Sequence, residues 1–165
     1  MSDDKVASGL ALHAEAVRPE WIDYNGHMNV GFYVLAFDHA TDALLDHVGM
    51  GADYRKKTNG SAFVVEAHVT YQQEVTEGTM LAFRTLVLGM DPKRIHLFHT
   101  MLKAEDGTPV ATNELMILHV DLGTRRTASI PEAAAARLAA LAADHAKLPR
   151  PKEAGKSIAI PAPRP

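Results

Sequence analysis

The strongest constraint on the fold is a change of hydrophobic period at residue 30. From residue 30 to residue 48 apolar residues recur at helical spacing, and an acidic stripe lies on another face. The apolar positions are Val30, Tyr33, Val34, Phe37, Ala40, Leu44 and Val48, and the acidic positions are Asp38, Asp42 and Asp46. Asn29 is a favourable N-cap and Gly49 a favourable C-cap. The segment predicts about five turns of amphipathic helix, whose apolar face must be covered.

Strand-like segments surround this helix. Residues 10–22 alternate before it, and Pro19, which cannot donate to a ladder, is expected to end that strand. Residues 49–61 are polar and contain glycines, which is typical of a loop. Four further strands are predicted at 62–75, 79–90, 93–104 and 109–122, with MDPK and EDGT as turns. In the first of them one face is predicted to hold Phe63, Val65, Ala67, Val69 and Tyr71. A second amphipathic helix is predicted over 131–146.

This element order predicts an α+β fold, in which an antiparallel sheet of about five strands wraps around the long helix. One domain covers residues 10–147, after a flexible segment at 1–9. A Pro-rich tail at 148–165 follows it and is expected to be extended or disordered. The strand at 62–75 is long and rich in β-branched residues, so it would be an exposed edge unless it pairs with another chain. We therefore expect a dimer with a continuous sheet.

The composition argues against several classes of protein. The 165 residues carry a formal net charge of -3 and include no Cys. No basic field favours nucleic acid or an anionic membrane, and there is neither a thiolate nucleophile nor a thiolate metal site. No apolar run approaches the ~20 residues that span a bilayer, and the first residues lack the apolar core of a secretory signal. We expect a cytoplasmic protein that binds neither nucleic acid nor membrane.

The sequence DYNGHMN, residues 23–29, directly precedes the long helix. This Asp-x-x-Gly-His-x-Asn pattern resembles the hot-dog-fold acyl-CoA thioesterases of the 4-hydroxybenzoyl-CoA thioesterase-like group, and the likeness covers residues 10–125. The resemblance implies an acyl-CoA substrate, no cofactor, and a homodimer or homotetramer. It assigns the catalytic carboxylate to Asp23 and the other motif positions to Gly26, His27 and Asn29. Many members carry a second Asn where this chain has Val30.

Two longer stretches, PEWIDYNGHMN and KRIHLFHTM, resemble a narrower branch, the betainyl-CoA thioesterases of carnitine breakdown. That likeness implies hydrolysis of betainyl-CoA to glycine betaine and CoA. Two alternatives fit the same architecture: a hot-dog hydratase or dehydratase, and a non-catalytic acyl-CoA-binding module. The Asp/His or His/Glu pairing that the hydratases share is not found at the expected place in this sequence.

Thioester hydrolysis needs an attacking oxygen and donors for the developing oxyanion. Asp23 can attack directly or activate a water, and the sequence leaves both routes open. The backbone N–H groups at the helix start, from Val30 through Gly31 to Phe32, are the expected oxyanion donors. The sequence also leaves open purely structural roles for the residues of the motif. Asp23 can cap a turn, Asn29 is first a helix cap, and His27 can brace the loop instead of transferring a proton.

Further candidates come from residue type alone. A pocket for a cationic acyl group needs aromatic faces and an acidic partner. The candidates are Trp21, Tyr33, Tyr71, Asp38 and Glu66. The candidate partners of the CoA phosphates are Arg55, Lys56, Lys57, Arg125 and Arg126. Each of these also has a plain interpretation as a core, interface or solvated residue. His96 and His99 stand three apart on a strand and so on opposite faces, and no metal site is expected there.

Overall fold

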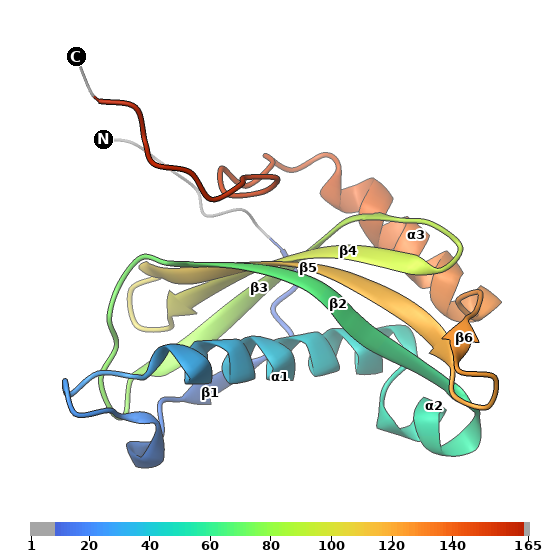
Figure 1. The fold of residues 1–165 in the computed structure, drawn as a ribbon, viewed down its shortest axis with the longest axis horizontal. Coiled ribbons are helices and arrows are strands. Elements are labelled where there is room, and N and C mark those ends of the chain that lie inside the picture. The colour runs from blue at the N-terminus through green and yellow to red at the C-terminus, as the bar shows by residue number, and fades with distance from the viewer. Residues whose placement is uncertain (1–8, 164–165) are drawn as a thin grey trace.

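In the computed structural model, which describes residues 9–163, a curved antiparallel sheet lies over one long helix (Figure 1). The elements in chain order are β1 (Ala14–Ala16), a 3₁₀ helix (Pro19–Trp21), α1 (Val30–Val48), α2 (Ala52–Lys57), β2 (Gly60–Tyr71), β3 (Met80–Met90), β4 (Arg94–Lys103), β5 (Pro109–Asp121), β6 (Arg126–Thr127) and α3 (Glu132–His145). The sheet order is β1-β3-β4-β5-β2, and β6 pairs with β5. The predicted α+β arrangement is confirmed. The segment predicted to be flexible, 1–9, lies outside the described residues except for Gly9.

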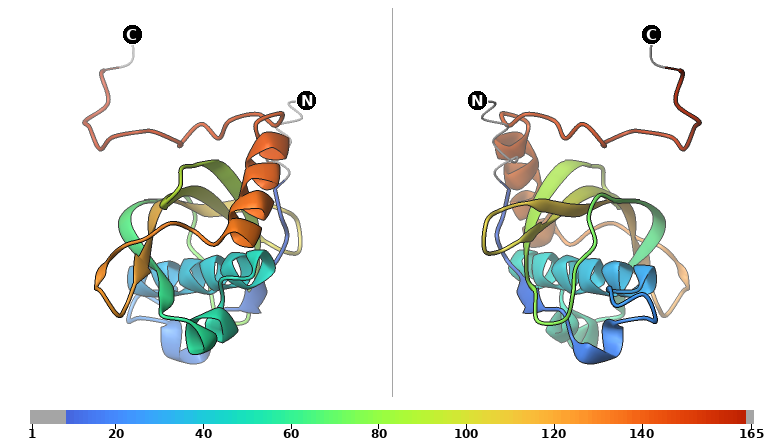
Figure 2. Two further views of the ribbon diagram at one scale, coloured as in Figure 1. Left: turned by 90° about the vertical axis from the view of Figure 1, so that its right-hand side faces the viewer. Right: turned by 90° about the vertical axis from the view of Figure 1, so that its left-hand side faces the viewer.

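Helix α1 begins and ends where the sequence predicts. The Asn29 side chain accepts a hydrogen bond from the Gly31 N–H at 3.0 Å, and Gly49 closes the helix in the left-handed conformation, with φ of 85°. The buried residues of α1 are Tyr33, Ala36, Phe37, Ala40, Thr41, Leu44, Leu45 and Val48. The sheet arches over this helix (Figure 2). Val30 and Val34, which the sequence placed on the buried stripe, are 58% and 45% exposed, so the single chain leaves this part of α1 uncovered.

Strand β2 is an edge of the sheet, because β5 is its one partner among the described strands. A β-bulge between Val64 and Glu66 leaves Val65 unpaired. Such an insertion reverses the alternation of side chains between the two faces. Ala67 faces α1 beyond the bulge, whereas Phe63 faces the other side, since their β5 partners, Leu115 and Leu118, lie on opposite faces of β5. The prediction that Phe63 shares a face with Ala67 is therefore wrong.

Two other segments differ from the prediction. Of the strand predicted at 10–22, β1 alone is regular, Leu10 forms an isolated bridge with Thr85, and Pro19 begins the 3₁₀ helix. The loop predicted at 49–61 contains α2, whose Tyr54 hydroxyl is hydrogen bonded to His119 Nε2 at 2.9 Å. This contact joins residues 65 positions apart, so the local sequence pattern carries no sign of it.

The C-terminal part of the chain packs against part of the sheet. Helix α3 packs along β3, where the Val87 N–H donates to His145 Nδ1 at 2.8 Å. Residues 146–163 form neither helix nor strand and run on the side of the sheet opposite α1 (Figures 1 and 2). There the Gly155 N–H donates to the Glu114 carboxylate at 2.7 Å. Within residues 9–163 no helix has the length and apolar character needed to cross a membrane.

His99 lies on the α1 side of β4, is fully buried, and joins the helix to the sheet. Its Nε2 is 3.0 Å from the Thr41 hydroxyl and its Nδ1 is 2.9 Å from the Thr85 hydroxyl. Because the Thr41 hydroxyl already donates to the Phe37 carbonyl, it accepts from the Nε2–H, and Nδ1 accepts from Thr85. Both nitrogens of the neutral ring are thus satisfied. Burial lowers the pKa of His99 to about 3.

This histidine should make the fold sensitive to acid. Between pH 6.5, its ordinary pKa, and about 3, the unfolded chain binds a proton at His99 that the folded chain does not. The free energy of unfolding should therefore fall as the pH is lowered through this window, by up to ~1.4 kcal/mol per pH unit from this one group. We expect His99→Gln to flatten the dependence, measured as urea unfolding free energy at pH 7.5, 6, 5 and 4. Parallel curves for the two proteins would contradict this expectation.

Candidate active site

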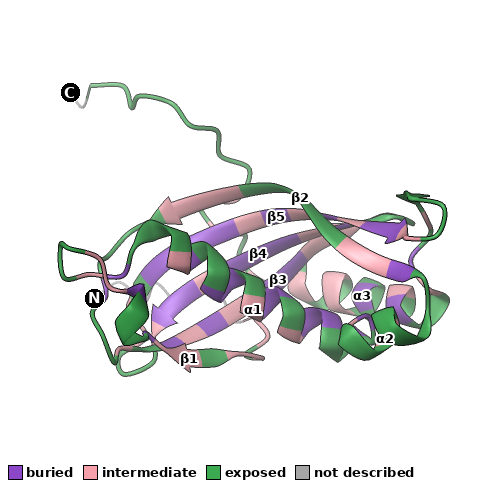
Figure 3. Cartoon of the chain, turned by 60° about the horizontal axis from the view of Figure 1, so that its bottom comes forward, coloured by how far each residue is buried: buried purple, intermediate pink, exposed green. Residues whose placement is uncertain are grey.

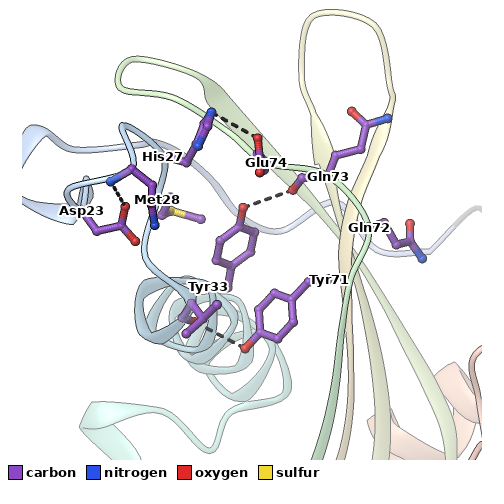
Figure 4. A pocket seen from close by; sticks show the side chains of 10 residues that line it. Asp23, His27, Met28, Tyr33, Tyr71, Gln72, Gln73 and Glu74 are labelled. Atoms are coloured by element: carbon purple, nitrogen blue, oxygen red, sulfur yellow. Dashed lines mark hydrogen bonds and ion pairs between the residues drawn. The ribbon is translucent and has the colours of Figure 1, made fainter. Parts of the chain in front are cut away.

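A cleft of about 970 Å³ opens between the loop before α1, the first turn of α1 and the segment that leaves β2 (Figure 4). It is lined by Asp23, Asn25, His27, Met28, Val30, Tyr33, Tyr71, Gln72, Gln73 and Glu74. The cleft therefore combines the motif predicted from the sequence with residues more than forty positions later, which β2 delivers to the same place.

The motif folds into a tight turn that fixes Asp23. The Gly26 N–H donates to the Asp23 carbonyl at 2.9 Å, and Gly26 has φ of 81°, a conformation that favours glycine. The Asn25 N–H donates to Asp23 Oδ1 at 2.8 Å, so the carboxylate does cap the turn, as one interpretation of the sequence held. Within residues 9–163 no donor reaches the other oxygen, Oδ2. The turn thus holds the carboxylate by one oxygen and leaves the second available.

The first N–H groups of α1 are not equally available. The Gly31 N–H is taken by the Asn29 side chain, and the Phe32 N–H donates to the Asn29 carbonyl at 3.0 Å. The Val30 N–H has no acceptor within residues 9–163, and Val30 lines the cleft. The prediction of a donor set from Val30 to Phe32 is therefore corrected. In this structure Gly31 and Phe32 are already engaged, and Val30 offers the free donor.

Two tyrosines form one wall of the cleft. Tyr33 is buried, and its hydroxyl donates to the Gln73 carbonyl at 3.1 Å. The Tyr71 ring is half exposed and meets the Tyr33 ring edge to face at 5.2 Å. Burial raises the pKa of the Tyr33 hydroxyl, and the nearby Glu74 carboxylate raises it further. Two of the candidate pocket residues, Tyr33 and Tyr71, thus line one cleft.

Glu74 is a residue of the cleft that the sequence analysis missed. Its Oε2 lies 3.1 Å from His27 Nε2, so an ion pair or hydrogen bond joins the motif loop to the segment after β2 (Figure 4). Glu74 stands just beyond the last residue of β2, Tyr71, in a polar run that has no motif of its own. No local signal in the sequence could have indicated that it approaches His27.

Three of the predicted pocket residues do not line the cleft. Trp21 is 2% exposed and packs in the core, where it stacks on Phe32 with ring centroids 5.6 Å apart. Asp38 is exposed on α1 and does not line the cleft. Glu66 faces the opposite side of the sheet, where it lines a separate cavity with His68 and His96. In a single chain these three side chains therefore do not line the cleft that holds Asp23.

The predicted basic partners of CoA gather at the other end of the molecule. Arg55 and Lys56 lie on α2, Arg125 lies in the turn between β5 and β6, and Arg126 is the first residue of β6. In Figure 1, α2 and β6 lie near the C-terminal end of α1, at the opposite end of the molecule from the start of α1. The cleft is lined by the first turn of α1. The 19 residues of α1 span roughly 28 Å at 1.5 Å per residue. These cations are thus a helix length away from the cleft of their own chain.

A cluster of two histidines around Glu15 was also not predicted from the sequence. Glu15 Oε1 lies 3.0 Å from His13 Nε2 and 2.7 Å from His39 Nδ1. The three ligand atoms are close enough to hold a metal ion. The geometry is also complete without one, because each ring donates one N–H to the shared carboxylate oxygen, and the cluster joins β1 to α1. His96 and His99 do lie on opposite faces of β4, as predicted: His99 bonds to α1 and His96 pairs with Glu114.

Comparison with known proteins places this chain in a wider group. The family described as the thioesterase-like superfamily matches residues 17–138. A betainyl-CoA thioesterase of Pseudomonas aeruginosa is 40% identical over 152 residues, which cover 92% of this chain and 96% of that protein. An L-carnitine dehydrogenase/betainyl-CoA thioesterase of Agrobacterium fabrum is 44% identical over 149 residues, but the match covers 30% of that longer protein. A Staphylococcus aureus protein solved in complex with CoA superposes with a TM-score of 0.86 at 30% identity, covering 96% of this chain and all of that one.

Proposed function

Since the chain belongs to the thioesterase-like superfamily and is an acyl-CoA thioester hydrolase of the hot-dog fold, we propose that it hydrolyses betainyl-CoA to glycine betaine and CoA. The observation that carries the choice of substrate is the 40% identity with a betainyl-CoA thioesterase along nearly the full length of both proteins. The hydratase and the non-catalytic binding module, which the sequence left open, find no support among these relatives.

In the proposed reaction, Asp23 promotes attack on the carbonyl carbon of the thioester, and the Val30 N–H binds the carbonyl oxygen. Asp23 Oδ2 either attacks the carbonyl carbon, forming a mixed anhydride that water then hydrolyses, or takes a proton from an attacking water. The Val30 N–H, at the positive end of α1, stabilises the negative charge that develops on the carbonyl oxygen. In both routes CoA leaves as the thiolate, which needs no strong general acid.

Gly31 supports the approach of a substrate to this helix end. A helical glycine costs about 0.5–1 kcal/mol relative to alanine. The position itself does not demand glycine, because a Cβ there would meet a single atom, Asn29 Oδ1, at the ordinary distance of 3.4 Å. A thioester that binds close to the backbone would explain why residue 31 has no side chain. His27, whose ring pairs with Glu74, is proposed to brace the loop and not to transfer the proton.

We also propose that the working unit contains a pair of chains joined through β2. This edge strand exposes Phe63, Val64 and Val65, at 48%, 44% and 56%, and the exposed side of α1 lies beside it (Figure 3). Pairing β2 antiparallel with its own copy sets the Gly60 end of one strand beside the Tyr71 end of the other. Arg55 and Lys56 of the partner subunit would then approach the cleft, close enough to bind the CoA phosphates.

Asp23→Asn should lower kcat by at least ~100-fold, because the amide keeps the turn but is neither nucleophile nor base. Asp106→Asn is the matched control, since Asp106 Oδ1 accepts from the Thr108 N–H at 2.9 Å in a similar turn far from the cleft. Release of CoA is followed with a thiol reagent. Because the protein has no Cys, it does not itself react with this reagent. A near-normal kcat for Asp23→Asn would remove Asp23 from the mechanism.

Betainyl-CoA should be preferred over its carbon isostere, 3,3-dimethylbutanoyl-CoA, which has the same shape and no charge. We expect kcat/KM to differ by ~10-fold or more, since aromatic faces and a carboxylate favour a desolvated cation. Equal values for the two substrates, with good turnover of both, would reject betainyl-CoA and keep the acyl-CoA hydrolase activity.

Val65→Lys should weaken pairing through β2 and lower activity together with it, because a charge would be placed on the strand edge. Met80→Lys is the control, since Met80 is 49% exposed and lies on β3, which pairs with β1 and β4. Light scattering reports the mass of each protein at assay concentration. A wild-type chain that is a stable monomer and fully active would overturn the proposed assembly.

A further inference from the structure

A betainyl group places its charge very close to the reacting carbonyl. The quaternary nitrogen and the carbonyl carbon are joined through one methylene, as N and C are joined through Cα in a peptide. The bond lengths and angle of that unit separate the two atoms by roughly 2.5 Å. A residue that recognises the cation must therefore lie in the same cleft as Asp23. The cation carries no N–H, so it is recognised by aromatic faces and by negative charge and not by hydrogen bonds.

The cleft offers two carboxylates, Asp23 and Glu74, among the residues that line it. Asp23 reacts at the carbonyl, and in the nucleophilic route its charge is lost when the anhydride forms. The nearby N-terminus of α1 carries positive character, which favours the oxyanion and disfavours the ammonium group. A second negative charge is thus needed, and it must stay constant through the reaction. Glu74 meets this requirement.

The contacts of Glu74 put it beside the aromatic wall. Its carboxylate is 3.1 Å from His27 Nε2, and Glu74 lines the same cleft as Tyr33. Tyr33 and Tyr71 present their rings in the same cleft, 5.2 Å apart (Figure 4). The arrangement is an acid next to two tyrosine rings, at the end of β2 that faces the start of α1.

We propose that Glu74 is the specificity-determining residue for a quaternary ammonium group in the acyl chain, with Tyr33 and Tyr71 as its aromatic partners. This inference rests on the proposed function, since it names the groups that would select that substrate. Glu74 takes no part in bond making or breaking. It lowers the free energy of the bound cation and leaves the carbonyl chemistry to Asp23 and Val30.

The test compares four proteins with two substrates. Wild type, Glu74→Gln, Glu74→Lys and the control Glu77→Gln are each assayed with betainyl-CoA and with 3,3-dimethylbutanoyl-CoA. Glu77 is exposed in the same connection between β2 and β3 but does not line the cleft. We expect Glu74→Gln to lower kcat/KM for betainyl-CoA by ~10-fold or more, mainly through KM, with the neutral substrate unchanged. Glu74→Lys should reverse the preference, and Glu77→Gln should behave as wild type.

The outcomes separate this inference from the function on which it rests. If wild type prefers betainyl-CoA and Glu74→Gln keeps that preference, the role of Glu74 is wrong and the substrate stands. Equal losses on both substrates would mean that Glu74 acts by positioning His27, which also overturns the inference. His27→Gln checks this point directly, because it should retain the preference for the cation. If wild type itself hydrolyses both substrates equally, the proposed substrate fails, and the role of Glu74 fails with it.

Discussion

Burial of one face of α1 is the constraint on which the rest of the structure depends. A helix of 19 residues with a continuous apolar face can be covered by one sheet only if that sheet curves along its length. The order β1-β3-β4-β5-β2 provides that surface, and His99 fixes the register between helix and sheet through Thr41 and Thr85. Once α1 is held in this way, its N-terminus has a fixed place beside the end of β2. The cleft forms where these two ends meet.

The features that the sequence predicted well are those that local chemistry specifies. The limits of α1 follow from the Asn29 cap and the left-handed Gly49, both of which act within a few residues. The turn at Asp23 follows from an Asp and a Gly three positions apart. The features that were missed depend on distant contacts. The bulge at Val65 has no residue signature, α2 is held by His119, and Glu74 reaches His27 only because the strand and the loop converge.

The cleft shows how local structure limits chemistry. Asn29 stabilises α1 by taking the Gly31 N–H, and this same bond withdraws that donor from a substrate. Among the described residues the Val30 N–H is left without an acceptor, and it lines the same cleft as a carboxylate whose Oδ1 is occupied by the turn. The Val30 N–H and the second carboxylate oxygen of Asp23 are thus not used by the hydrogen bonds that hold the helix start in place. The sequence alone could not distinguish occupied groups from available ones, because both lie within the same short stretch, residues 23–31.

The C-terminal segment has a consequence for how such molecules can stack. It runs on the side of the sheet away from α1, and the Gly155 N–H is bonded there to Glu114, which also pairs with His96. Back-to-back contact between two sheets at this position would have to displace the segment from Glu114. Docking of the tail and stacking of the sheets at this position are therefore mutually exclusive. The residues after α3, far in sequence from the motif at Asp23, therefore control whether this face of the sheet is open to contact with another molecule.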